Sequence, residues 1–127
     1  MYLKNPHVHD GLVTFVADDD VFLAPLEGGW ATRLSAERAG ASDPHFAPDG
    51  QHIAWASPRD GHPEVIVASL ASGEVRRLTW LASTMLRVLG WADAETILIA
   101  TTFGATEMRE QNVHAVQLTG EVTRRSE

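Results

Sequence analysis

Residues 43–79, the stretch that decides the fold, read DPHFAPDGQHIAWASPRDGHPEVIVASLASGEVRRLT. Short runs of β-branched and aromatic residues alternate here with polar residues, and none has the period of an amphipathic helix. Turns such as Pro48-Asp49-Gly50 and Asp60-Gly61 separate the runs. Asp-Gly favours tight hairpins because glycine readily adopts a positive φ and the carboxylate accepts bonds from nearby backbone N–H groups. The stretch therefore predicts four short antiparallel strands.

The same pattern occurs three times along the chain. An earlier copy, residues 5–35, reads NPHVHDGLVTFVADDDVFLAPLEGGWATRLS, and a later copy, residues 87–126, reads RVLGWADAETILIATTFGATEMREQNVHAVQLTGEVTRRS. The copies end at Ser35, Thr79 and Ser126, at spacings of 44 and 47 residues. A period of about 40 to 45 residues is typical of a four-stranded propeller blade. The sequence therefore predicts an all-β protein, a β-propeller of about three four-stranded antiparallel blades.

The chain length fits this arrangement, because 127 residues are enough for about one domain. We expect one partial propeller over residues 1–127, with blade one at 5–35, blade two at 43–79 and blade three at 86–126. The hairpin at 103–111 is longer than its equivalents and is expected to be a surface loop.

Equivalent positions of the three copies predict the core. The matching apolar residues are Val13 and Phe15, Ile53 and Trp55, Ile97 and Ile99, and, at the end of the third strand, Leu26, Leu70 and Leu118. One position departs from this pattern, because Arg125 stands where the earlier copies have Leu34 and Leu78. We therefore expect the outer strand of blade three to be more exposed.

Composition excludes several classes of function. The chain has 10 Lys and Arg against 17 Asp and Glu, a net charge of -7 that would repel nucleic acid and anionic membranes. It has no cysteine, which excludes disulfides and thiolate chemistry. No apolar run has the length of a signal peptide or a membrane helix. We expect a cytoplasmic protein that binds neither nucleic acid nor a membrane.

The repeat resembles a known propeller motif. Its elements are Phe46-Ala47-Pro48-Asp49-Gly50, Ile53-Ala54-Trp55, Arg59-Asp60-Gly61 and Arg76-Arg77-Leu78-Thr79. This pattern is similar to the Pro-Asp-Gly repeat of TolB-type proteins, prolyl oligopeptidase relatives and tricorn protease. The opening residues 2–9, together with 20–29, 77–81 and 87–91, look like the N-terminus of the tricorn protease family of actinobacterial style.

The resemblance implies a place in a larger protease. In the tricorn family a six-bladed propeller comes first, a seven-bladed propeller follows, and PDZ and serine-protease core domains come last, together trimming peptides released by the proteasome. Three blades would be half of the first ring, and no catalytic residue of the family falls within this chain. The resemblance thus implies a noncatalytic scaffold that gates or binds peptides. The alternative is a TolB-type protein-interaction propeller unrelated to proteolysis.

Three residues are candidates for lining the central channel. His7 and His45 both follow a proline at the same repeat position, which places them on the innermost strands of blades one and two. Arg87 is the candidate on blade three. A metal site at these histidines is the weaker hypothesis, because their equivalent positions in the repeat already explain why both are present. We expect no cofactor and no metal.

Other residues have structural explanations. Asp49, Gly50, Arg59, Asp60 and Gly61 form the structural motif of the repeat, and the charges of Arg59-Asp60-Gly61 are expected to brace neighbouring loops. The acidic run 18–20 predicts a hairpin tip of solvated carboxylates. No serine lies on a Gly-x-Ser-x-Gly elbow, so no nucleophile is predicted. Among the tryptophans, Trp55 and Trp91 are predicted core residues, whereas Trp30 and Trp80 are expected near blade ends, facing a partner.

Three blades leave an apolar face bare at both ends of the stack, because a blade buries its faces only against neighbours. Two occupants can cover these faces. One is a second copy of the chain, giving a homodimer that joins the first blade of each copy to the third blade of the other and so completes a six-bladed ring. The other is the set of remaining blades of a longer chain.

Overall fold

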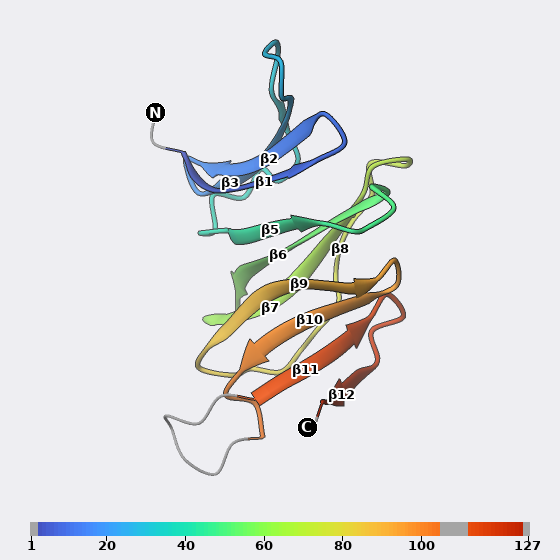
Figure 1. Cartoon of the computed structure of the whole chain (residues 1–127). Helices are drawn as coiled ribbons and strands as arrows, with labels where there is room; N and C mark the ends of the chain where they lie inside the picture. Colours follow the sequence, from blue (N-terminus) through green and yellow to red (C-terminus); the bar gives the residue numbers. More distant parts are fainter. Residues whose placement is uncertain (1–2, 105–111, 126–127) are drawn as a thin grey trace.

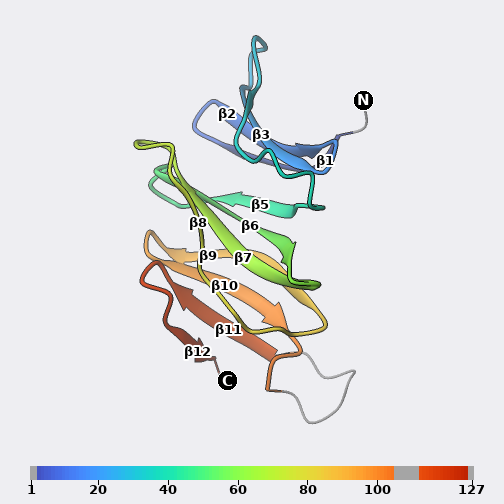
Figure 2. The ribbon, with the colours of Figure 1, turned by 180° about the vertical axis from the view of Figure 1, so that it is seen from behind.

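The computed structural model describes residues 3–104 and 112–125. Within these two ranges, twelve strands form three sheets of four antiparallel strands, and no helix occurs. Figures 1 and 2 show the sheets stacked in chain order. The prediction of an all-β chain made of three four-stranded antiparallel units is confirmed. No helix long and apolar enough to cross a membrane is found in the described ranges.

Each sheet is a meander in which consecutive strands are neighbours. The first sheet contains β1 (Lys4–His9), β2 (Leu12–Ala17), β3 (Asp20–Pro25) and β4 (Thr32–Arg33). The second contains β5 (Ser42–Phe46), β6 (His52–Arg59), β7 (His62–Ser69) and β8 (Val75–Arg77). The third contains β9 (Leu86–Asp93), β10 (Thr96–Thr101), β11 (Asn112–Gln117) and β12 (Val122–Arg124). The first strands of the sheets, β1, β5 and β9, lie side by side, and we call them the inner strands.

The tight turns form where the sequence supplies aspartate and glycine. Asp60 and Gly61 have φ of 55° and 83°, and Asp10 and Gly11 have φ of 48° and 81°. Two consecutive positive φ values define a hairpin turn that matches the twist of the flanking strands. At Gly50 a second constraint applies, because a Cβ there would lie 3.0 Å from His9 Nε2 of the neighbouring sheet.

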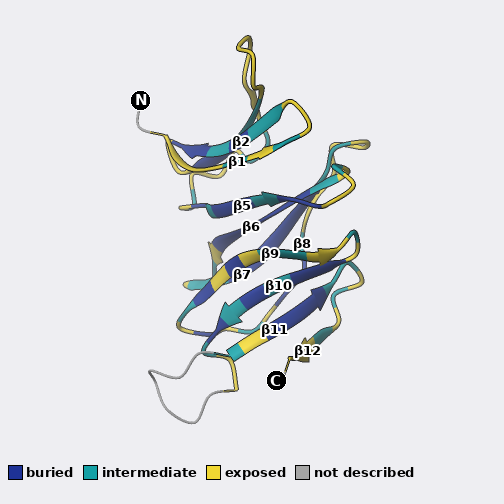
Figure 3. Ribbon diagram, in the orientation of Figure 1, coloured by how far each residue is buried: buried dark blue, intermediate teal, exposed yellow. Residues whose placement is uncertain are grey.

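The second sheet is buried on both faces because alternate residues of β6 enter two different cores. Ile53 and Trp55 enter the core shared with the first sheet, whereas Ala54 and Ala56 enter the core shared with the third. The first core also contains Val16, Val21, Ala41, Phe46, Ile66 and Ala68. The second core also contains Val65, Val67, Leu78, Leu86, Val88, Ile97, Ile99 and Val116. Figure 3 accordingly shows β5, β6 and β7 largely in the colour of buried residues.

The first sheet has an outward face that no other sheet covers. Val13 and Phe15 lie on this face and are only half-buried, although their equivalents Ile53 and Trp55 are fully buried. Leu26 follows β3 on the same side and is 55% exposed. The prediction that these three residues belong to the core is therefore wrong. Their repeat positions face the preceding blade, and blade one has none in this chain.

The third sheet has the opposite open face. Leu98 and Ala100 are half-buried there, and Val113 is 40% exposed. Arg125 is exposed, as predicted, whereas its equivalent Leu78 is buried in the second core. Both residues donate a backbone N–H bond of 2.8 Å to the third strand of their sheet. The strand geometry is therefore repeated, and only the side chain at this position changes.

The acidic run 18–20 differs from its prediction. Asp18 and Asp19 form an exposed turn, but Asp20 is buried. Its Oδ1 accepts bonds from Ser35 Oγ at 2.8 Å and from the Arg38 N–H at 3.0 Å. The prediction of a solvated carboxylate is wrong for Asp20, because this residue begins β3 and anchors the segment that leads from the first sheet to the second.

Glu64 occupies the equivalent position of the second sheet and is also buried. Its carboxylate accepts bonds from Thr79 Oγ1 at 2.6 Å and from the N–H groups of Leu81 and Ala82 at 3.0 and 2.9 Å. Arg77 Nη2 lies 3.6 Å away. A buried carboxylate in the first three residues of the third strand thus holds the connection to the next sheet, both from the first sheet to the second and from the second to the third.

Candidate site on the inner strands

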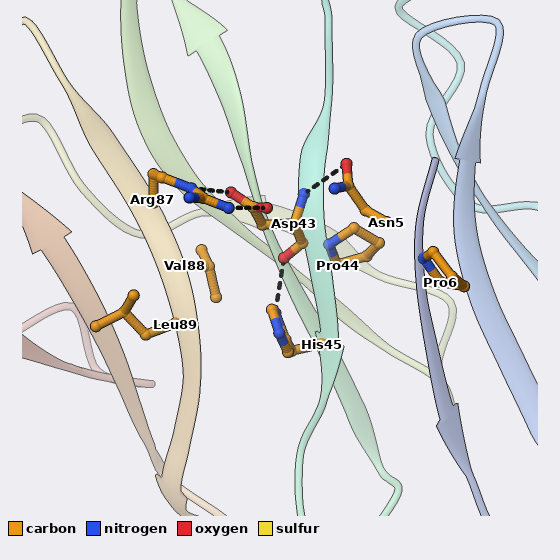
Figure 4. A pocket seen from close by; sticks show the side chains of 8 residues that line it. All are labelled: Asn5, Pro6, Asp43, Pro44, His45, Arg87, Val88 and Leu89. Carbon is orange, nitrogen blue, oxygen red and sulfur yellow. Dashed lines mark hydrogen bonds and ion pairs between the residues drawn. The ribbon is translucent and has the colours of Figure 1, made fainter. Parts of the chain in front are cut away.

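A pocket of about 290 Å³ opens along the three inner strands (Figure 4). It is lined by Asn5, Pro6, Asp43, Pro44, His45, Arg87, Val88 and Leu89. Asn5-Pro6 and Asp43-Pro44 are repeat equivalents, because each pair lies at the same register shift of its inner strand. All three inner strands therefore contribute neighbouring residues to the pocket.

The polar centre of the pocket is the pair of Asp43 and Arg87. Arg87 Nε and Nη2 donate to the two carboxylate oxygens of Asp43 at 3.2 and 3.0 Å. The Arg87 side chain is 64% exposed and that of Asp43 only 9%. The hydrogen bonds and the charge of Asp43 raise the pKa of Arg87 above its ordinary value. The Asp43 N–H also donates to Asn5 Oδ1 at 3.4 Å, so one residue from each of the three inner strands belongs to a single polar chain.

The local sequence explains how Asn5 and Asp43 reach these positions. Their φ values are 53° and 55°, in the left-handed region that asparagine and aspartate adopt more readily than most residues. Each precedes a proline, and each lies at a register shift in the pairing of its inner strand. The resulting irregularity turns the start of the strand so that its side chain points along the row of inner strands.

The predicted residues His7 and His45 lie next to each other, with ring centroids 4.8 Å apart. His7 Nδ1 accepts the Phe46 N–H at 3.0 Å, and His45 Nδ1 lies 2.9 Å from the Asp43 carbonyl oxygen, to which it donates. Burial lowers the pKa of His7, and the neighbouring His45 and His9 lower it further. His7, His45 and Arg87 thus lie on adjacent inner strands, and their place beside a channel stays a prediction.

The tautomer of His7 argues against a metal site here. Because its Nδ1 accepts a backbone N–H, the proton of the neutral ring is on Nε2, and neither nitrogen has a free lone pair for a metal. Within residues 3–104 and 112–125, no group of three or more His, Asp or Glu side chains is arranged to hold a metal ion.

The repeat-motif residues lie at turns away from the pocket. Asp49 Oδ1 accepts the Gln51 N–H at 3.0 Å in the turn that contains Gly50. Arg59 forms an ion pair of 3.1 Å with Glu37, which lies in the connection between the first and second sheets. Asp60, next to Gly61, lies 3.4 Å from Arg77 Nη1.

Of the two tryptophans predicted in the core, Trp55 is fully buried and Trp91 is partly buried. Trp91 packs against the second core and donates from its indole N–H to the His45 carbonyl oxygen at 3.0 Å. Trp30 and Trp80 are exposed, the latter with the Arg77 guanidinium 4.6 Å from its ring.

Sequence reasoning missed Asn5 and Asp43 as members of the polar chain. The signal that could have found them is the residue type before each proline at the same repeat position. It also missed Asp20 and Glu64 as buried anchors, although Asp20 begins β3 and Glu64 is the third residue of β7.

Stacked four-stranded meanders with their first strands side by side define this chain as a segment of a β-propeller. Residues 1–127 match the family described as the tricorn protease N-terminal beta propeller domain, and the chain belongs to that family. It is 44% identical to tricorn protease homolog 1 of Streptomyces coelicolor, over 94% of this chain and 11% of that protein. It is 34% identical to the putative tricorn-like protease N-terminal subunit of Sulfurisphaera tokodaii, over 80% of this chain and 53% of that protein.

Solved structures support the same fold. The crystal structure of the tricorn protease superposes with a TM-score of 0.83 at 21% identity, over 93% of this chain and 12% of that chain. TolB from Acinetobacter baumannii superposes with a TM-score of 0.80 at 17% identity, over 97% of this chain and 32% of that chain. This chain therefore spans only part of the proteins that it matches. As a propeller domain, it is not the catalytic part of the protease family.

Proposed function

We propose that this chain is a noncatalytic scaffold of a tricorn-like peptide-degrading protease in the cytoplasm, and that its inner strands contact peptides. The observation that carries the proposal is the match to the tricorn N-terminal propeller over residues 1–127. We further propose that the three sheets are blades with the bounds 5–35, 43–79 and 86–126, as expected from the sequence. A polar pocket along the inner strands supports peptide contact, because peptides carry backbone groups that seek hydrogen-bond partners.

Arg87 is the residue through which peptide contact can be tested. Its guanidinium is exposed, and two hydrogen bonds to Asp43 hold it in a fixed orientation. The N–H groups that do not bond to Asp43 are therefore available to a peptide in the pocket. We expect Arg87→Ala to weaken binding of short peptides by about tenfold, the value of one charge-assisted hydrogen bond. Isothermal titration calorimetry with a set of oligopeptides measures this. Arg124→Ala, on the outermost strand of the third sheet, is the control and should bind as the wild type does. Equal affinity of all three proteins would contradict the proposed site.

The open sheet faces carry the same kinds of residue as the faces buried inside the stack. Val13 and Phe15 on the first sheet correspond to Ile53 and Trp55, which the preceding sheet covers. The open face of the third sheet is likewise apolar apart from its edge, where Arg125 replaces leucine. A face of this kind fits another blade. We propose that a second copy provides it, so that two chains close a six-bladed ring, with the remaining blades of a longer chain as the alternative cover.

The homodimer predicts a mass in solution of twice 13.8 kDa by light scattering. Phe15→Asp is expected to reduce this mass to that of a monomer, because it places a charge on the outward face of the first sheet. Val75→Asp changes an exposed residue of an outer strand and should leave the dimer intact. A folded wild-type monomer would contradict the homodimer and leave the blades of a longer chain as the cover.

A TolB-type interaction propeller is the second candidate, favoured by the close superposition on TolB. Sequence identity supports the first candidate, because the chain is 44% identical to a tricorn protease homolog over 94% of its length and 34% identical to a TolB homolog over 50% of its length. A protease core encoded with this segment would support only the first candidate.

A further inference from the structure

The joint between the first and second sheets depends on side chains at the inner strands. β1 and β5 lie side by side, and two backbone N–H groups of β5 donate across the joint to side chains of β1. The bond from Asp43 to Asn5 is 3.4 Å long, whereas the bond from Phe46 to His7 is 3.0 Å long. Phe46 is buried, so His7 is the acceptor that satisfies a donor otherwise removed from water.

This bond requires a neutral His7. A neutral imidazole has one nitrogen that accepts, whereas an imidazolium has two N–H donors and no acceptor. When His7 is protonated, its Nδ1–H therefore faces the N–H of Phe46, and two donors oppose each other. Protonation of His7 therefore removes this hydrogen bond from the joint.

The surroundings of His7 offer little to stabilise a positive charge. His9 on β1 and His45 on β5 are the nearest titratable side chains, and both disfavour a charge on His7. The carboxylate of Asp43 on β5 is held by Arg87 of β9. β2, which pairs with β1, has no charged side chain between Leu12 and Ala17. Burial and these neighbours place the pKa of His7 below its ordinary value of 6.5.

We propose that His7 is a pH-sensitive latch between the first and second sheets, closed by its neutral imidazole and opened by its protonation. The sign follows from linkage. A histidine whose pKa is lower when folded contributes its full stability above about pH 6.5, and this contribution is lost as the pH falls through the folded pKa. Mild acid thus loosens the joint between the first and second sheets, where the His7 bond lies.

Urea unfolding of the purified chain at about pH 7.5 and about pH 5 tests the latch. For the wild type we expect the folding equilibrium constant to fall about tenfold for each unit by which folding lowers the pKa of His7. His7→Asn supplies an amide oxygen that accepts the Phe46 N–H and does not titrate. The stability of this variant should therefore fall less than that of the wild type when the pH is lowered. His62→Asn, at the first residue of β7, should lose as much stability between these pH values as the wild type does.

Nuclear magnetic resonance of the wild type gives an independent measurement. The imidazole of His7 should titrate below pH 6.5, and the Phe46 amide signal should shift with the same midpoint. The proposal is overturned if His7 titrates at or above pH 6.5, or if the Phe46 amide signal does not shift with that titration. It is also overturned if His7→Asn loses as much stability at the lower pH as His62→Asn does. Since the first two readings need no variant, they decide the matter even if His7→Asn does not fold.

Discussion

Replacement of Glu64 by alanine is expected to lower the free energy of unfolding by about 3 kcal/mol or more. The carboxylate is buried and accepts bonds from the Thr79 hydroxyl and from the N–H groups of Leu81 and Ala82. Alanine would leave the buried Thr79 hydroxyl and the N–H groups of Leu81 and Ala82 without this acceptor. The connection between the second and third sheets would lose its anchor, and the second core would open at one end.

Urea unfolding followed by circular dichroism measures this loss. Glu121→Ala, which changes an exposed carboxylate in the turn before β12, is the control and should stay within about 0.5 kcal/mol of the wild type. Glu64→Gln keeps one carbonyl oxygen of the same reach, so its loss should lie between those of the two alanine variants. If Glu64→Ala unfolded at the same urea concentration as Glu121→Ala, the proposed anchor would be wrong.

The repeat made most of the fold predictable. The alternating apolar runs of the sequence indicate second strands at Leu12–Ala17 in blade one and Thr96–Thr101 in blade three, which are the observed bounds of β2 and β10. For the outer strand of blade one, the same pattern indicates residues 31–35, but only the two residues of β4 lie in a strand. An outer strand pairs on one side only, and its apolar pattern continues into the connection to the next sheet. Sequence pattern therefore does not mark its end.

The site was predictable only in part. Position in the repeat was sufficient to place His7, His45 and Arg87 on the inner strands. The ion pair of Asp43 with Arg87 was not predictable, because it joins different blades and depends on how far one sheet is displaced against the next. The same limit explains Phe15, whose repeat position indicates a core residue although the neighbour that would bury it is outside this chain.

Replacement of Trp55 by alanine is expected to lower the free energy of unfolding by about 3 to 5 kcal/mol. Trp55 is 1% exposed and lies in the core between the first and second sheets. Its removal would leave a cavity that the facing strands cannot fill, because their own side chains are held by the strand pairing. Trp30→Ala removes the same side chain from a place where it is 93% exposed and should cost less than about 0.5 kcal/mol.

Phe15→Ala extends this experiment to the open face, because Phe15 is the repeat equivalent of Trp55. If another blade covers Phe15 only in an assembled ring, its replacement should have little effect on a dilute chain and a growing effect as the protein concentration rises. Urea midpoints measured at several protein concentrations separate these cases. A large loss of stability that does not depend on protein concentration would mean that Phe15 is buried within the single chain. For the tryptophan variants, equal urea midpoints of Trp55→Ala and Trp30→Ala would contradict the core between the first and second sheets.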